Sequence, residues 1–103
     1  MSKRLEGRVA IVTGAGSSGP GWGNGKAAAV LYAREGAKVV CADIEPAAAE
    51  ETVAIIRGEG NAAETVACDV SKAADVQALV ARTRTAFGGR IDMAGGIDDT
   101  VDL

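Results

Sequence analysis

The chain has 103 residues, of which 48% are apolar and 24% are charged, and its formal net charge is −3. This length allows one small domain at most, and this balance predicts a folded globular protein. A mildly acidic chain offers no electrostatic basis for binding nucleic acid or an anionic membrane surface, so we expect neither as a partner. The sequence contains no histidine, the commonest general base and metal ligand, and we expect no metal site.

Two features bear on the cellular compartment. The apolar run of residues 9–12 is too short for the core of a signal peptide or for a membrane span. Cys41 and Cys68 fall in predicted strands without Cys-x-x-Cys spacing, which favours buried structural thiols over a redox or metal-binding role. We therefore expect a cytoplasmic protein.

The first half of the chain alternates strand and helix signals. Residues 8–13 form a short apolar run closed by glycine, as expected of a strand buried on both faces. A helix is predicted from residue 24 or 26 to residue 35. It ends before Gly36, which suits the left-handed position after a helix. Residues 37–42 form a second predicted strand.

The second half continues this alternation. Residues 47–57 predict a helix with Pro46 in its first turn, and residues 65–68, extended back to residue 62, predict a third strand. Ser71 is the predicted N-cap of a third helix over residues 72–87. The apolar stripe of this helix consists of Val76, Leu79, Val80, Thr83 and Phe87.

This order of elements predicts an α/β fold. Short turns between alternating strands and helices imply right-handed crossovers and a Rossmann-like, doubly wound parallel sheet. Residues 90–92 begin a fourth strand, but residues 93–96 are too few and too rich in glycine to continue it well. We expect residues 1–103 to form a single, incomplete dinucleotide-binding domain with about three full strands and a partial fourth. The unpaired sheet edge would favour self-association.

Six glycines lie in residues 13–26, between the first strand and the first helix. Such a turn binds phosphate through free N–H groups and the helix dipole, and glycine lets the phosphate approach the backbone. The pattern Gly14-x-Gly16-x-x-Gly19 matches the dinucleotide fingerprint literally, but Pro20 and Gly21 follow it, which hinders a closely packed helix start. Either Gly21-Trp22-Gly23 or Gly23-Asn24-Gly25 could be the pair that enters the helix, and we prefer Gly21-Trp22-Gly23, with Asn24-Gly25 as the first-turn entry.

The phosphate loop of nucleoside triphosphatases is disfavoured here. That loop needs a glycine where Pro20 stands and a hydroxyl side chain where Ala27 follows Gly25-Lys26, and both requirements fail. A surface connection without a ligand is the plainest alternative. Trp22 is interpreted as a plug beneath the loop or as a lid over a bound nucleotide.

Asp43 connects the loop to a particular ligand. It ends the second predicted strand twenty positions after Gly23, the spacing at which a carboxylate accepts hydrogen bonds from a ribose 2′-OH. A carboxylate would repel the 2′-phosphate of NADP, so NAD is favoured over NADP. Asp69 and Val70, after the third strand, are candidate contacts for adenine. The candidate cofactor-binding residues are Gly14, Gly19, Gly21, Trp22, Gly23, Asp43, Asp69 and Val70.

Several spaced motifs together resemble the N-terminal part of a short-chain dehydrogenase/reductase. They are residues 4–14, 33–40, Asp43, residues 69–70 and residues 87–92. The resemblance implies binding of NAD(P) and hydride transfer to or from an alcohol or carbonyl group.

The sequence also departs from the family pattern. The glycine loop is lengthened, residues 93–96 replace the Asn-Asn-Ala-Gly signature, and the catalytic Tyr-x-x-x-Lys and its partner serine are missing. Tyr32 is followed four positions later by Gly36, so it cannot substitute, and no catalytic residue is assigned. We expect the NAD-binding portion of an oxidoreductase, truncated and without its catalytic half. The alternatives are a non-catalytic nucleotide-binding or assembly module and a non-functional truncated reading frame.

Overall fold

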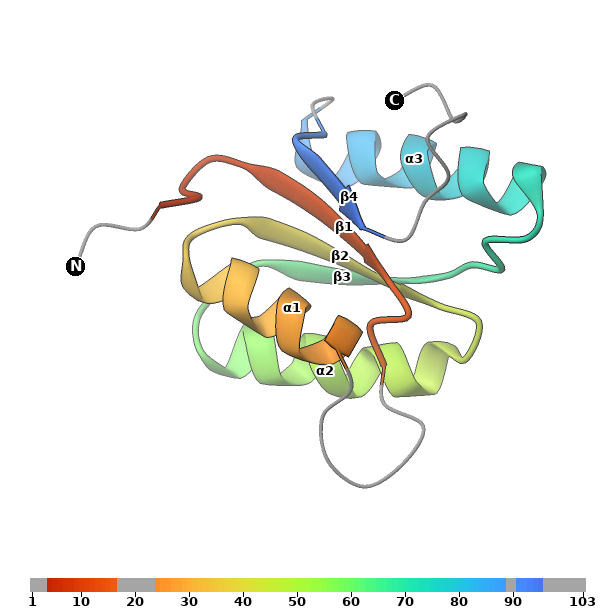
Figure 1. Cartoon of the computed structure of the whole chain (residues 1–103). Helices are drawn as coiled ribbons and strands as arrows, with labels where there is room; N and C mark the ends of the chain where they lie inside the picture. Colours follow the sequence, from red (N-terminus) through yellow and green to blue (C-terminus); the bar gives the residue numbers. More distant parts are fainter. Residues whose placement is uncertain (1–3, 17–23, 89–90, 96–103) are drawn as a thin grey trace.

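The computed structural model describes residues 4–16, 24–88 and 91–95, in which strands and helices alternate (Figure 1). This alternation confirms the predicted α/β class. In chain order the elements are β1 (Val9–Thr13), α1 (Asn24–Arg34), β2 (Lys38–Asp43), α2 (Pro46–Gly58), β3 (Ala63–Ala67), α3 (Ala73–Phe87) and β4 (Met93–Gly95).

The four strands form one parallel sheet in the order β3-β2-β1-β4. The chain builds outward from β1 to β3 and then returns to the opposite side of β1 to form β4. In doubly wound sheets, the place where the strand order reverses opens a crevice at the carboxyl ends of the strands, and ligands bind there. In this chain that place lies between β1 and β4.

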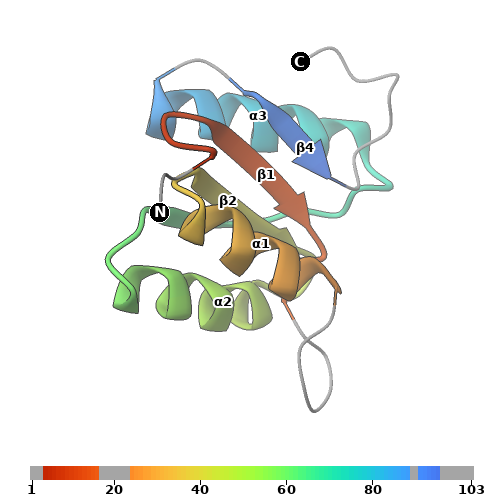
Figure 2. The same cartoon turned by 60° about the vertical axis from the view of Figure 1, so that its left-hand side comes forward.

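Helices cover both faces of the sheet, as the two views show (Figure 2). Helices α1 and α2 lie on one face and α3 lies on the other. The side chains of β1 alternate between them: Ala10 and Val12 belong to the core under α1 and α2, and Ile11 belongs to the core under α3. All three are at most 4% exposed, which confirms that this strand is buried on both faces.

The predicted helix boundaries rest on special backbone positions. Gly36 follows α1 with φ +101°, and Gly88 follows α3 with φ +89°, a left-handed conformation that glycine adopts without strain. Pro46 lies in the first turn of α2, where its missing N–H costs no helical hydrogen bond. The predicted stripe of α3 faces the core: Val76, Leu79, Val80 and Thr83 are buried, and Phe87 is half-buried.

Three local predictions need correction. The N-cap of α3 is Lys72, not Ser71, because the helix begins at Ala73, and the Ser71 hydroxyl donates a hydrogen bond to Oδ1 of Asp69 at 2.6 Å. Cys68 lies one residue beyond β3. The short fourth strand confirms the predicted partial strand, but it is formed by Met93–Gly95, which pairs with residues 10–12 of β1, whereas it was expected to begin at residues 90–92. A parallel ladder is built from backbone groups, so a small, glycine-containing segment can pair with a central strand.

No helix in the described part of the chain is both long enough and apolar enough to cross a membrane.

Candidate functional site

The predicted site residues that the structure describes gather at the carboxyl edge of the sheet. Gly14 follows β1, Asp43 is the last residue of β2, and Asp69 comes two residues after β3. The three strands are parallel neighbours, so their carboxyl ends lie at one edge. The structure therefore brings together residues that are up to 55 positions apart in the sequence.

The glycine turn begins at Gly14, which has φ +63°. Helix α1 approaches this turn through Gly25: a Cβ on Gly25 would overlap the Gly14 carbonyl oxygen and lie 2.7 Å from the carbonyl carbon. The helix can therefore contact the turn only where it has no side chain. Close packing of the helix on the strand is the role of the last glycine in the dinucleotide fingerprint.

A second close approach comes from α2. A Cβ on Gly16 would overlap Cβ of Ala48 and lie 2.7 Å from its carbonyl carbon. One helical turn further on, the hydroxyl of Thr52 donates a hydrogen bond to the Ala15 carbonyl oxygen at 2.7 Å, and Thr52 is fully buried. Both α1 and α2 therefore hold the turn in place, from its two sides.

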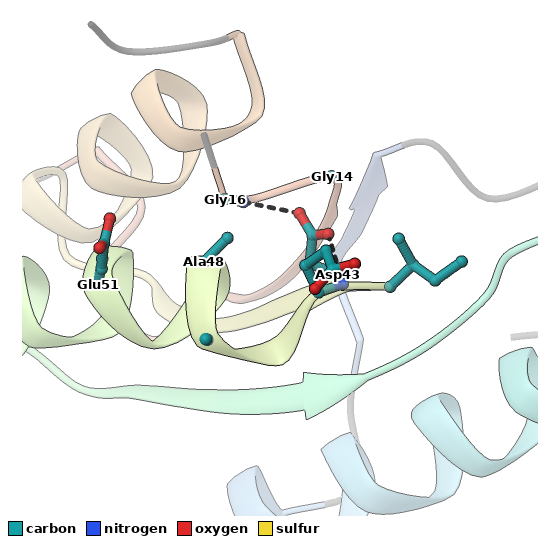
Figure 3. A pocket seen from close by; sticks show the side chains of 8 residues that line it. Gly14, Gly16, Asp43, Ala48 and Glu51 are labelled. Carbon is teal, nitrogen blue, oxygen red and sulfur yellow. Dashed lines mark hydrogen bonds between the residues drawn. The ribbon is translucent and has the colours of Figure 1, made fainter. Parts of the chain in front are cut away.

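The Asp43 carboxylate occupies the space in front of this turn (Figure 3). Its Oδ2 accepts a hydrogen bond from the Gly16 N–H at 2.9 Å, and its Oδ1 accepts one from the Glu45 N–H at 2.9 Å. Each carboxylate oxygen has two acceptor sites, so each can accept one further hydrogen bond. The carboxylate is therefore held in a fixed orientation and can still accept hydrogen bonds from two hydroxyl groups, such as those of a ribose.

An open pocket of about 610 Å³ lies beside this carboxylate, between the glycine turn and the start of α2. Among the described residues that line it, three are acidic, Asp43, Glu45 and Glu51, and none is basic. Glu51 extends from α2 on the side of the helix that carries Ala48 toward the turn (Figure 3). The charged groups of this lining are thus all negative, which disfavours a further negative charge beside Asp43.

A second hollow of about 370 Å³ adjoins the first and reaches the end of β3. Its lining includes two apolar side chains that are strongly exposed, Ile44 (66%) and Val70 (49%). Asp69, also in the lining, accepts hydrogen bonds from the Ser71 hydroxyl and N–H through Oδ1. These bonds lower the pKa of the Asp69 carboxyl. The hollow offers apolar surface for a flat ring and a carboxylate for an amino group.

The structure also shows what the sequence interpretation missed. Gly19, Gly21, Trp22 and Gly23 lie outside the described residues, so their roles stay predictions. Gly25 was placed at the start of the helix in both predicted registers but was not named as a site residue. The regular spacing of Gly21, Gly23 and Gly25 was the sequence signal that could have identified Gly25. For Thr52 and Glu51, which α2 brings to the turn, no sequence motif gave a signal.

The two cysteines are buried, as predicted. Burial raises the pKa of the Cys41 thiol to about 12 and raises that of Cys68 as well. Among the described residues, no group of three or more acidic or cysteine side chains is placed to hold a metal ion.

The fold and the site define the class of protein. A parallel sheet that reverses its order beside β1, a glycine turn after that strand and an acidic residue at the end of the next strand characterise one half of a Rossmann-like fold. Comparison with known proteins gives the family. The chain belongs to the short-chain dehydrogenase family, whose model matches residues 8–95.

Similar sequences include the sex determination protein tasselseed-2 of Zea mays, which is 43% identical over 93 residues, 90% of this chain and 25% of that protein. A D-threitol dehydrogenase of Mycolicibacterium smegmatis is 42% identical over 90 residues, 87% of this chain and 32% of that enzyme. The chain therefore spans a third or less of the length of these two relatives and matches their N-terminal part.

Solved structures with a similar fold include members of the same family. A short-chain dehydrogenase/reductase from Burkholderia phymatum, in complex with NAD, has a TM-score of 0.79 and 38% identity, with 91% of this chain and 31% of that chain covered. A hydroxysteroid dehydrogenase from Escherichia coli has a TM-score of 0.81 and 35% identity, with 88% and 36% covered.

Proposed function

We propose that this chain binds the adenosine and pyrophosphate part of NAD as the cofactor-binding portion of a short-chain oxidoreductase. The observation that carries the proposal is the Asp43 carboxylate, which Gly16 and Glu45 orient beside an open pocket. In this assignment the Asp43 carboxylate accepts hydrogen bonds from the ribose hydroxyls. Ile44 and Val70 contact the adenine ring, and the Asp69 carboxylate accepts a hydrogen bond from the adenine amino group. Residues 1–103 then form a single, incomplete dinucleotide-binding domain.

The pyrophosphate is assigned to the glycine turn. Gly25 lets the start of α1 approach Gly14 closely, and a helix N-terminus attracts a phosphate through its free N–H groups and its dipole. Gly19, Gly21, Trp22 and Gly23 would complete this cradle. Because Gly25 is the glycine that packs against Gly14, the register that ends in Gly23-Asn24-Gly25 is favoured over the one that ends at Gly23.

The pocket favours NAD over NADP. NADP carries a phosphate on the 2′-oxygen of the adenosine ribose, which would enter a space lined by Asp43, Glu45 and Glu51. Unlike a hydroxyl, that phosphate cannot donate to a carboxylate and is repelled by it. We therefore assign the cofactor as NAD.

Bound NAD supplies a carbon that accepts or gives up a hydride. The residues of this chain would bind and orient the cofactor. The only tyrosine, Tyr32, lies in α1, half-buried against the core under α1 and α2, and no Tyr-x-x-x-Lys pair occurs in the sequence. Hydride transfer to an alcohol or carbonyl substrate would need a proton donor and acceptor from elsewhere.

Calorimetric titration with NAD and with NADP tests the proposal, with the fluorescence of Trp22, the only tryptophan, as a second signal. NAD should bind about tenfold or more tightly than NADP. Asp43→Asn should weaken NAD binding about tenfold, because hydrogen bonds to a charged acceptor are worth about 1.5–3 kcal/mol. Absence of heat and of a fluorescence change with NAD would contradict the assignment.

Two neighbouring residues of α2 provide a matched control. Glu51 lines the pocket beside Asp43, whereas Glu50 lines a separate hollow between α2 and β3. Glu51→Gln should narrow the preference for NAD by tightening NADP binding, and Glu50→Gln should leave both affinities unchanged. Equal effects of the two substitutions would show that overall charge, not the pocket, sets the preference.

One observation favours a second function, that of an assembly module. In the described part of the chain, β4 lies at the edge of the sheet and pairs only with β1. The free edge presents backbone N–H and C=O groups that could pair with a strand of a second chain. Sedimentation over a range of concentrations tests this, since a strictly monomeric chain that binds NAD would exclude it.

A further inference from the structure

Thr52 has a polar side chain that is buried among apolar residues of the core. It is fully buried in α2, in the layer where Ala49, Val53 and Ile56 pack against the sheet. Its hydroxyl donates to the Ala15 carbonyl oxygen at 2.7 Å, a hydrogen bond between residues 37 positions apart. A buried hydroxyl without a partner is costly, so this bond joins α2 to the glycine turn.

The bond acts on one peptide group. The carbonyl of Ala15 and the N–H of Gly16 belong to the same planar unit, so they point in opposite directions and turn together. Thr52 holds the carbonyl end of this unit, and Oδ2 of Asp43 accepts from its N–H end at 2.9 Å. The N–H of Ala15 is also occupied, since it donates to the Ala42 carbonyl at 3.2 Å.

From this geometry we infer that Thr52 is a positioning residue: through the Ala15–Gly16 peptide group it sets the orientation of the Asp43 carboxylate. Thr52 itself is buried behind the turn and does not line the pocket. The inference rests on the proposed function, because it takes Asp43 as the group that accepts hydrogen bonds from the ribose. It adds that nucleotide affinity depends on a hydroxyl in α2 that the ligand does not touch.

The test uses the 103-residue chain and two readouts, the NMR signal of the Gly16 amide without nucleotide and the affinity for NAD. Thr52→Val keeps the shape of the side chain and removes the donor. It should shift the Gly16 amide signal and weaken NAD binding about five- to tenfold, the loss expected for one buried hydrogen bond. Thr52→Ser keeps the donor and should retain a wild-type amide signal and nearly wild-type affinity.

Thr83 provides a matched control. It is also fully buried, but its hydroxyl donates to the Leu79 carbonyl at 2.8 Å within α3, on the opposite face of the sheet. Thr83→Val should leave the Gly16 amide and the NAD affinity unchanged at temperatures where all variants are folded. If Thr83→Val reproduces the effects of Thr52→Val, the role of Thr52 is merely structural and the inference is wrong.

The remaining outcomes are also decisive. An unchanged Gly16 amide in Thr52→Val would overturn the inference. If that variant fails to fold, Thr52→Ser decides: a wild-type Gly16 amide supports the inference and a displaced one refutes it. If the wild-type chain binds no NAD, the proposed function fails, while the amide readout still decides whether Thr52 orients the peptide group.

Discussion

The contact between α1 and the glycine turn leads to a sharp prediction for Gly25→Ala. A methyl group at this position would overlap the Gly14 carbonyl oxygen and lie 2.7 Å from the carbonyl carbon and 3.3 Å from Cα of Ala15. Real Cβ atoms essentially never come closer than 3.0 Å to a heavy atom beyond their own residue and its chain neighbours. The obstacle is backbone, which has no rotamer to change, so α1 must move away from the end of β1.

Two effects of opposite sign determine the result. Alanine is a better helix former than glycine by about 1 kcal/mol in a helix interior, which is the upper limit of the gain at Gly25, the second residue of α1. Overpacking against a rigid partner costs about 3 kcal/mol, the upper end of the usual range. We expect a net loss of about 2 kcal/mol in the free energy of unfolding, which lowers the Tm of a domain of this size by about 10 °C. NAD affinity should fall as well, because the start of α1 would leave the phosphate position.

Thermal and urea unfolding followed by circular dichroism measures this loss, and Gly58→Ala is the control. Gly58 is the last residue of α2, and an added Cβ would have open space around it. Gly58→Ala should therefore be stabilising by about 0.5 kcal/mol. If Gly25→Ala raises the Tm as Gly58→Ala does, the close approach of α1 to the turn is not a feature of the folded protein.

Two further predictions concern titration. Ser71→Ala removes the hydroxyl that contributes most to the low pKa of Asp69, so this pKa should rise toward its ordinary value, as carboxyl NMR titration would show. The stability from the ionised Asp69 is present above its ordinary pKa and is lost as the pH falls, so the variant should lose less stability in acid. The Cys41 thiol, with its pKa raised to about 12 by burial, should resist iodoacetamide at pH 8 until urea unfolds the chain. Because this pKa is raised, stability should fall as the pH rises above 9, and alkylation of Cys41 in the folded chain would contradict the structure.

Much of the fold was predictable because its signals are local. Gly36 and Gly88 mark helix ends through a backbone conformation that glycine adopts without strain, and Pro46 marks a helix start. The short apolar run at β1 indicated a strand buried on both faces. The sequence predicted a partial fourth strand but not its position, because the pairing of Met93–Gly95 depends on β1, which is remote in the sequence.

The candidate site was also predictable only in its local features. The sequence by itself determined the alternation of strands and helices, the glycine turn after β1 and the acidic residue at the end of β2, since each depends on residues adjacent in the chain. Only the tertiary structure decided that Gly25 packs against Gly14, that Gly16 donates to Asp43 and that Thr52 holds the Ala15 carbonyl. The physical reason is that these contacts require the strand register and the position of α2 on the sheet. Both follow from packing between segments that are distant in the sequence.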